Sequence, residues 1–416
     1  MNAALPGHGS RGSQTLALNM KLLGHHELGG YGGMGEGMAM QLARDGRRIL
    51  WMAHESAPRN FTAVDVSDPR APRMIVQTDL PHARVRSNSL DIVGDTMIVA
   101  YQTQEVGMKP AGFDVFDIAN PDAPRLISHF DASGPHSRGV HAVWFVDGEY
   151  VHMGSGAADF TPTHPLDDQC YRIVDVRDRS RPREVGRWWY PGTRVGDAAP
   201  PPQRLEPRFD LGFRAHNTNV FPERPDRAYV GYIDGGAVIL DIADKTNPTL
   251  VSLWRYSPPF NGMCHTVLPL FSRELLVVAD ECILDDGADW PKLVRVVDAR
   301  VETNLVPIST FPQGAYEAFA HRGGRSGSHN LHENLPVPGS FRSDTLIVGS
   351  FFNQGVRAYD LTDPFQPREV AYYVPGAPKL APTGTIQLND VYVDDRRIVY
   401  TMDRMIGGLY ILELAV

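Results

Sequence analysis

One phrase recurs along the whole chain: an apolar strand ending in an acidic residue, a turn rich in Pro, Asp and Asn, and a second apolar strand. It is clearest in residues 61–73 (FTAVDVSDPRAPR), 113–125 (FDVFDIANPDAPR) and 356–368 (VRAYDLTDPFQPR). Seven copies occur, marked by Asp65, Asp117, Asp175, Asp241, Asp298, Asp360 and Glu413. The markers lie 52 to 66 residues apart, which suits a propeller blade of four strands and their loops.

A second pattern precedes several of these phrases. Residues 90–101 (LDIVGDTMIVAY) and 391–402 (VYVDDRRIVYTM) are typical of a strand, a tight turn and a strand. A blade therefore has strands a to d, and the marker acid ends strand c, where a carboxylate can fix the following turn. We assign the marker acids this structural role and no chemistry.

The last copy stops after strand c at Val416, which would leave an unpaired sheet edge. Residues 20–27 (MKLLGHHE) resemble the outer strands 125–131 and 368–373. We therefore predict an all-β fold, a single seven-bladed propeller closed by an N-terminal strand that completes the C-terminal blade. The expected divisions are a flexible arm at 1–19 and a propeller at 20–416, with blades at roughly 36–80, 86–135, 138–190, 214–257, 262–311, 327–374 and 386–416 plus 20–27.

Composition narrows the range of partners and compartments. The 416 residues are 42% hydrophobic and carry a formal charge of −9 without any basic run, so a nucleic-acid partner is not expected. No stretch approaches the roughly 20 apolar residues of a membrane helix, so no membrane association is expected. Three cysteines without Cys-x-x-Cys spacing, and no secretory h-region in residues 1–14, predict a cytoplasmic protein.

Histidine is enriched where chemistry is expected in a propeller. The start of strand a lines the central channel and lies on the same face as the b–c loops. Read blade by blade, these starts contain Asn88, His141, His216 with Asn219, His265, His329 with His332, and Asn389 with Asp390. Four of seven blades thus offer a histidine, although histidine makes up only 15 of the 416 residues.

Imidazoles from several blades can meet on the axis, and imidazole is a common ligand for Zn, Cu and Fe. The sequence therefore predicts a transition-metal site, for Fe, Cu, Mn or Zn, with candidate ligands His141, His216, His265, His332 and His329. His329 and His332 are three residues apart, so only one of them can face the channel on a regular strand. Periodicity does not choose between them. For any single histidine, a hydrogen-bonded structural role is the more common alternative, and Asn88 and Asn389 occupy equivalent places.

A ligating imidazole needs an acceptor at its second nitrogen. The b–c loops supply polar groups at the same mouth, among them Glu105, Asp234, Asn353 and Arg404. Glu333, next to His332, is a further candidate acceptor or general base. We predict catalytic roles for Glu333, Glu105, Asp234 and Arg404, and substrate-orienting roles for Asn88, Asn389 and Asn353.

Other catalytic arrangements have weaker support. The chain has no Gly-x-Ser-x-Gly elbow. Residues 29–37 (GGYGGMGEG) lack the Lys-Ser/Thr of a phosphate loop, so we interpret them as a flexible entry to the first blade.

The phrases VDVSDP, FDIANP, VDVRD and YDLTDP resemble the LVIVD-type repeat. From residue 20 to residue 416 the chain resembles LVIVD-repeat β-propellers, distant relatives of the selenium-binding protein and methanethiol oxidase group. The resemblance implies the propeller fold and, with iron or copper bound, oxidative chemistry. A scaffold does not by itself fix a reaction.

Three long connections, 191–213, 312–327 and 375–385, are expected on the histidine face and predict a covered pocket. Phe160, Trp290, Phe319, Phe351 and Phe352 could form its apolar wall, which favours a small apolar or aromatic substrate. Two alternatives remain open: a metal-assisted lyase, hydrolase or isomerase at the same site, and a non-catalytic propeller that binds another protein.

Overall fold

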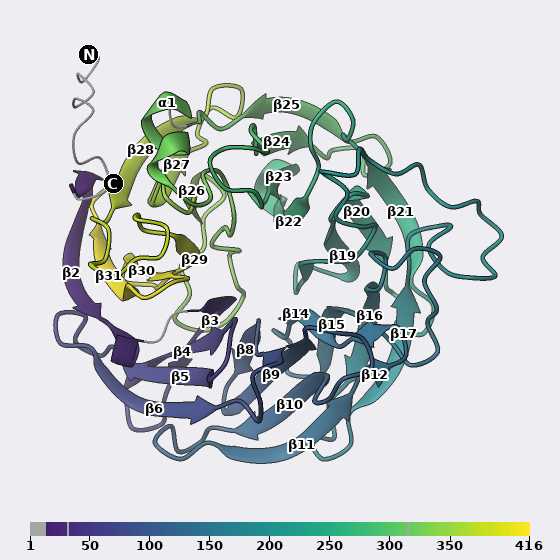
Figure 1. The fold of residues 1–416 in the computed structure, drawn as a ribbon, viewed down its shortest axis with the longest axis horizontal. Helices are drawn as coiled ribbons and strands as arrows, with labels where there is room; N and C mark the ends of the chain where they lie inside the picture. The colour runs from purple at the N-terminus through teal and green to yellow at the C-terminus, as the bar shows by residue number, and fades with distance from the viewer. Residues whose placement is uncertain (1–13, 31–32, 314–315) are drawn as a thin grey trace.

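Alternating apolar residues and tight turns form seven antiparallel sheets arranged around one axis (Figure 1). This computed structural model describes residues 14–30, 33–313 and 316–416. The first four blades follow the chain from the inner strand outward. The first blade contains β3 (Met34–Leu42), β4 (Arg48–His54), β5 (Arg59–Asp65) and β6 (Arg73–Asp79), and the second contains β8 (Leu90–Val93), β9 (Thr96–Thr103), β10 (Gly112–Asp117) and β11 (Arg125–Asp131). The third contains β14 (Val140–Trp144), β15 (Tyr150–Ser155), β16 (Cys170–Asp175) and β17 (Arg183–Trp188). The fourth contains β18 (Thr218–Phe221), β19 (Arg224–Tyr232), β20 (Gly236–Asp241) and β21 (Thr249–Trp254).

The remaining blades complete the ring. The fifth contains β22 (Cys264–Leu270), β23 (Leu275–Asp280), β24 (Val294–Asp298) and β25 (Val306–Thr310). The sixth contains β26 (Leu346–Ser350), β27 (Val356–Asp360) and β28 (Arg368–Val374), and the seventh contains β29 (Leu388–Val393), β30 (Ile398–Asp403) and β31 (Gly408–Leu414). Smaller elements are β7 (Val85–Arg86), β12 (Ser133–Gly134), β13 (Ser137–Arg138), η1 (Leu28–Gly30), η2 (Phe271–Arg273), α1 (Tyr316–Phe319) and η3 (Ala320–Arg322). No helix among the described residues has the length and apolar character needed to cross a membrane.

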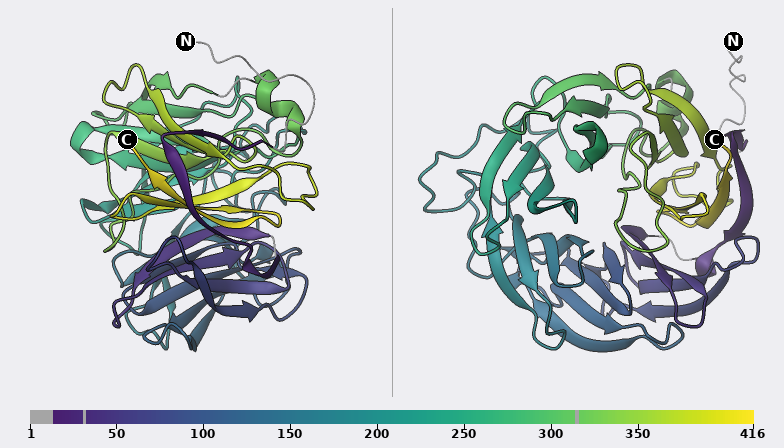
Figure 2. Two further views of the ribbon diagram at one scale, coloured as in Figure 1. Left: turned by 90° about the vertical axis from the view of Figure 1, so that its left-hand side faces the viewer. Right: turned by 180° about the vertical axis from the view of Figure 1, so that it is seen from behind.

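The N-terminal region closes the ring, as predicted. Strand β2 (Met20–His26) pairs with β31, from Met20 opposite Leu414 to His26 opposite Leu409. Figure 2 shows this purple strand beside the yellow C-terminal blade. The pairing confirms the all-β propeller completed by its N-terminal strand.

The segment predicted as a flexible arm is partly a strand. Residues 16–18 form β1 (Leu16–Leu18), which pairs with β28 at the outer edge of the sixth blade. Residues 1–13 lie outside the described residues. At its inner edge the sixth blade has no regular strand in the described ranges: Leu331 forms an isolated bridge with Gly349.

The marker acids have the structural role that the repeat predicts. Asp65 Oδ1 accepts the Ser67 amide at 3.1 Å, and Asp117 Oδ1 accepts the Ala119 amide at 3.0 Å. Asp117 Oδ2 also accepts from Arg125 at 2.8 Å. The acid thus holds both the turn and the arginine that begins strand d, which explains why the two residues recur together.

The inner strands carry an extra residue near their starts. The register shifts between Val140 and Ala142, between Cys264 and Thr266, and between Leu388 and Asp390. A bulge of this kind re-aims one side chain away from the regular alternation of the strand. In three blades the bulged residues are His141, His265 and Asn389, so the bulges determine what faces the axis.

Candidate metal centre

Four imidazoles from four consecutive blades surround one carboxylate. The Nε2 atoms of His141, His216 and His265 lie 3.7, 3.6 and 3.5 Å from Glu36 Oε2, and His329 Nε2 lies 3.5 Å from Glu36 Oε1. The rings also touch one another, with centroids 4.3 Å apart for His141 and His216 and 4.0 Å apart for His216 and His265. The structure therefore brings together four of the five histidines that the sequence singles out.

Each ring is oriented by a contact at its other nitrogen. The Nδ1 contacts are His141 with Gln102 Oε1 at 2.9 Å, His216 with Asn217 Oδ1 at 2.8 Å, His265 with Thr266 Oγ1 at 2.8 Å, and His329 with the Asn389 carbonyl at 2.5 Å. Acceptors in this position are what fix ligating histidines in metal sites. All four Nε2 atoms are thereby directed to the same point.

A second carboxylate completes the cluster. Glu281 Oε1 lies 3.4 Å from His329 Nε2, and Glu281 Oε2 lies 4.0 Å from His216 Nε2. Arg325 donates to Glu281 Oε1 at 2.8 Å and so holds this side chain in place. Ligand atoms of Glu36, His216, His265 and Glu281 all lie within 4.8 Å of one another, and together they form a group that could hold a metal ion.

The contact between His141 and His216 is short. Their Nε2 atoms are 2.7 Å apart, and each Nδ1 faces an amide oxygen. Arg86, 3.4 Å from His141 Nδ1, is already committed to Gln102 Oε1 at 2.6 Å. If both rings carry their proton at Nδ1, two nitrogen lone pairs face each other and a shared metal ion would hold them together. If one ring carries its proton at Nε2, the contact is a hydrogen bond.

Ionisation in the cluster follows its neighbours. Burial lowers the pKa of His141 well below its usual value and that of His216 to about 4, so both rings stay neutral. Burial alone would raise the pKa of Glu36, but the surrounding histidines lower it well below its usual range. For His329, burial is outweighed by Glu281 and Glu36, and the pKa is raised. A charged carboxylate beside the neutral rings of His141 and His216 is a donor set that transition metals accept.

Glu36 is the residue that sequence reasoning missed. It occupies in the first blade the place that Asn88, the four histidines and Asn389 occupy in the other six. Its amide donates to the Asn88 carbonyl at 2.6 Å, and Asn389 Nδ2 donates to the Gly35 carbonyl at 3.1 Å. The glycine-rich stretch interpreted as a flexible entry therefore ends within β3 as part of the site; its residues 31–32 lie outside the described residues.

His332 does not join the cluster. Its Nε2 contacts the Phe341 carbonyl at 2.7 Å, and its Nδ1 accepts the Val393 amide at 3.2 Å. Both nitrogens are therefore used within the sixth and seventh blades. The irregular inner segment of the sixth blade turns His329 to the axis instead, which strand periodicity could not determine.

Other predicted residues lie away from the imidazoles. Glu105 forms a surface ion pair with Arg84. Asp234 is buried, and its Oδ2 accepts the amides of Leu211 and Gly212 at 2.9 and 2.8 Å. Asn353 Nδ2 donates to the Phe319 carbonyl at 2.9 Å. The last two residues thus anchor connections near the mouth, and within the described part of the chain none of the three hydrogen-bonds to a cluster histidine.

Four predicted residues lie around the cluster. Asn88 Nδ2 donates to the His141 carbonyl at 3.3 Å, and the Asn389 carbonyl holds His329. Arg404 donates to Glu55 Oε1 and Oε2 at 2.8 Å. Glu333 Oε1 accepts from Asn217 at 2.7 Å and from Asn219 at 2.9 Å. Asn217 therefore links Glu333 to His216.

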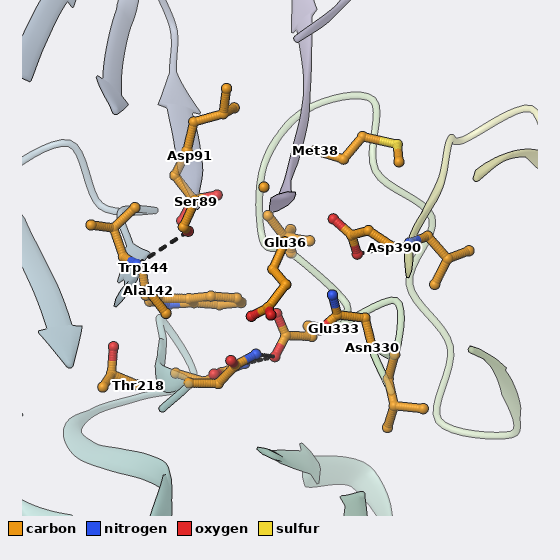
Figure 3. Close-up of a pocket in the computed structure, with 18 residues that line it drawn as sticks. Glu36, Met38, Ser89, Asp91, Ala142, Trp144, Thr218, Asn330, Glu333 and Asp390 are labelled. Carbon is orange, nitrogen blue, oxygen red and sulfur yellow. Dashed lines mark hydrogen bonds between the residues drawn. The ribbon is translucent and has the colours of Figure 1, made fainter. Parts of the chain in front are cut away.

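Beyond Glu36 the channel continues as a cavity of about 40 Å³. Figure 3 shows Glu36, Asp91, Glu333 and Asp390 around it, each from a different blade. Trp144, Met38 and Leu331 supply apolar parts of the wall. This volume has room for a few water molecules and no more.

Comparisons with known proteins extend to the repeat and the fold. The LVIVD repeat family matches residues 226–254, in the fourth blade. No curated protein matches the chain.

The Cps50 (Swd1) β-propeller domain of Myceliophteria thermophila is 12% identical with a TM-score of 0.54, covering 92% of this chain and 98% of that one. A chain of the mitotic checkpoint complex is 13% identical with a TM-score of 0.54, covering 100% and 96%. A putative 6-phosphogluconolactonase from Bacteroides uniformis is 11% identical with a TM-score of 0.52, covering 81% and 85%. At these identities the likeness shows the propeller fold alone: the chain is a seven-bladed β-propeller containing an LVIVD repeat.

Proposed function

We propose that the protein is a metal-dependent oxidoreductase that acts on a small organic molecule at the four-histidine cluster. The observation that carries the proposal is the convergence of four Nε2 atoms on one ionised carboxylate, each ring fixed through its Nδ1. His265 Nε2, His329 Nε2 and Glu36 Oε2 are buried, and the separations of 3.5 Å between Glu36 and these two rings are longer than an ordinary hydrogen bond.

The residues fit a transition metal. Neutral imidazoles with a carboxylate suit Fe, Cu, Mn or Zn, and metal–nitrogen bonds of about 2.1 Å place neighbouring ligand atoms roughly 3 to 4 Å apart. The separations of 3.4 to 4.0 Å between Glu and His ligand atoms have this size. His141, His216, His265 and His329 would hold the ion, with Glu36 or Glu281 as an additional ligand.

An ion held there would supply Lewis acidity and, as iron or copper, electron transfer. The oxidative reaction is proposed because LVIVD-repeat propellers, which the repeat phrases resemble, are taken to be distant relatives of the methanethiol oxidase group. The chain's own part is to orient the rings through Gln102, Asn217 and the Asn389 carbonyl. His141 lies on the approach side, since its side chain is 11% exposed whereas those of His265 and His329 are fully buried.

Metal analysis of purified protein tests the first half of the proposal. Wild type should carry about one transition-metal ion per chain, and His141→Ala and His265→Ala should lose it. The matched control is His129→Ala, because His129 is a partly exposed imidazole paired with Asp114 on an outer strand. Folded wild type that binds none of Fe²⁺, Cu²⁺, Mn²⁺ or Zn²⁺, or variants that retain the ion, would contradict the proposal.

Oxygen uptake tests the second half. Metal-loaded wild type should consume oxygen with at least one member of a panel of small aromatic and aliphatic compounds, and His265→Ala should not. Stoichiometric metal without any such uptake would remove the oxidative assignment and leave the metal site standing.

A further inference from the structure

Arginines from five blades gather above the histidine cluster. Arg86, Arg138, Arg214, Arg325 and Arg404 have side chains that are only 15 to 29% exposed. Arg86 Nη2 lies 3.4 Å from His141 Nδ1. Arg325 and Arg404 lie over the ring of Phe352 at 5.3 and 5.9 Å, and that ring stacks on His329 at 4.7 Å. The guanidinium groups of Arg86, Arg325 and Arg404 therefore lie next to the cluster.

Carboxylates do not balance these arginines. Glu55 accepts from both Arg86 at 2.7 Å and Arg404 at 2.8 Å. Asp168 accepts two hydrogen bonds from Arg138, at 2.6 and 3.0 Å, and lies 3.9 Å from Arg214. With the pair of Arg325 and Glu281, and with Glu36 in the cluster below, five guanidinium groups face four carboxylates. The excess lies at Arg86 and Arg404, which share the single carboxylate of Glu55. Partly desolvated positive charge in excess attracts anions.

One cavity is lined by two of these arginines, Arg86 and Arg404. It has a volume of about 430 Å³, and Arg86, Arg404 and Glu55 lie on its polar side. Ala57, Pro382 and Ile406 give it an apolar side. Such a volume suits a small ligand. The mixed lining suits a molecule with one charged end and an apolar body.

We propose that this cavity binds a small organic carboxylate, with its anionic group against Arg86 and Arg404 beside the histidine cluster and its apolar body on Pro382 and Ile406. A guanidinium pairs with a carboxylate through charge-assisted hydrogen bonds. The identification of this anion as the substrate rests on the proposed function. The binding itself does not need a metal ion.

The probes are benzoate and its neutral analogue benzamide, titrated calorimetrically into chelator-treated and metal-loaded protein. Benzoate should bind both forms, and benzamide should bind at least about tenfold more weakly, as the loss of hydrogen bonds to a charged group implies. Arg404→Gln should weaken benzoate binding by about the same factor and leave benzamide unchanged. The control, Arg300→Gln, removes an arginine that is 71% exposed on a turn and should behave as wild type.

A second variant guards against misfolding. Glu55→Gln removes the carboxylate that competes for Arg86 and Arg404, so benzoate should bind more tightly than to wild type, a result that no unfolded variant can give. Equal binding of benzoate and benzamide, unchanged binding in both variants, or inorganic phosphate binding as tightly as benzoate would overturn the proposal. Since chelator-treated protein is tested, a missing metal site would leave this result intact, and a missing anion site would leave the metal analysis intact.

Discussion

At one level of the channel the inner strands present four imidazoles around Glu36. One to four residues after the inner-position residues Asn88, His329 and Asn389, the chain presents the carboxyl groups of Asp91, Glu333 and Asp390 around the 40 Å³ cavity, called the lower cavity below. The imidazoles, Asp91 and Asp390 are buried, and Glu333 is partly buried. The two levels differ in what surrounds the charge.

Burial acts on the carboxyl groups at both levels, with opposite outcomes. In the lower cavity it raises the pKa of Asp390 to about 8, and that of Asp91 well above its usual value. At the cluster the histidines outweigh burial and keep Glu36 ionised. Within the channel, the carboxyl group surrounded by nitrogen ligands is held ionised, whereas burial favours the protonated form of Asp91, Glu333 and Asp390.

Replacing one carboxyl group at each level is the strongest test of this comparison. Glu36→Gln removes the charge that all four imidazoles face, and we expect metal affinity to fall by roughly 100-fold. Asp390→Asn changes the same chemical group in the lower cavity and should leave metal affinity unchanged. Competition titration with a chromophoric chelator measures both affinities. Equal losses in the two variants would mean that the levels do not differ.

Metal removal should lower the stability of proteins in which the histidine cluster is intact, and should not change that of proteins in which it is broken. An ion that binds only the folded chain, at 100 times its dissociation constant, adds about 2.7 kcal/mol to the free energy of unfolding. A chelator should therefore lower the melting temperature of wild type and of Asp390→Asn, and leave that of His265→Ala unchanged. Differential scanning calorimetry with and without chelator provides the measurement. A chelator effect that persists in His265→Ala would place the stabilising ion elsewhere.

How far the sequence predicts these two levels depends on how local each feature is. The repeat phrase contains its own turn, marker acid and arginine, so blade number, order and closure could be predicted from short segments. The four histidines could also be found, because equivalent positions in several blades repeat one residue type.

The rest needs the assembled ring. Glu36 lies in a glycine-rich stretch without strand alternation, and only the requirement that the first blade also fill its inner position would have indicated it. The inner segment of the sixth blade is irregular. Strand periodicity therefore could not show which of His329 and His332 faces the axis. Arg86, Arg138, Arg214 and Arg325 each precede the inner-position residue of their blade by two to four residues. This shared position could have indicated them, whereas Arg404 follows strand β30 and is brought to them only by the closed ring.

Asn217 joins the two levels and offers a finer test. Its Oδ1 orients His216, and its Nδ2 donates to Glu333. Asn217→Ala should lower metal affinity by about tenfold, the usual effect of losing a partner that orients a ligand. Asn219→Ala removes only the donation to Glu333, so its metal affinity should stay that of wild type. The same chelator competition compares them, and equal affinities would show that His216 needs no such support.

The lower cavity is tested without any metal, through the pH dependence of stability. The pKa of Asp390 is about 8 in the folded chain and near 3.9 when unfolded. Below the unfolded value both states are protonated and Asp390 contributes no difference. As pH rises from there to about 8, only the unfolded chain releases the proton, so wild type loses stability relative to Asp390→Asn, and above this range the loss is constant.

Each pKa unit between the unfolded and folded values is worth about 1.36 kcal/mol, so we expect the free energy of unfolding of wild type to fall by several kcal/mol relative to that of Asp390→Asn as the pH rises to about 8. Urea titrations of both proteins at pH 5, 7 and 9 measure it. A gap between the proteins that stays constant over this range would mean that Asp390 is ionised in the folded chain. The lower cavity would then hold a permanent negative charge next to Glu36, and the distinction between the two levels of the channel would be lost.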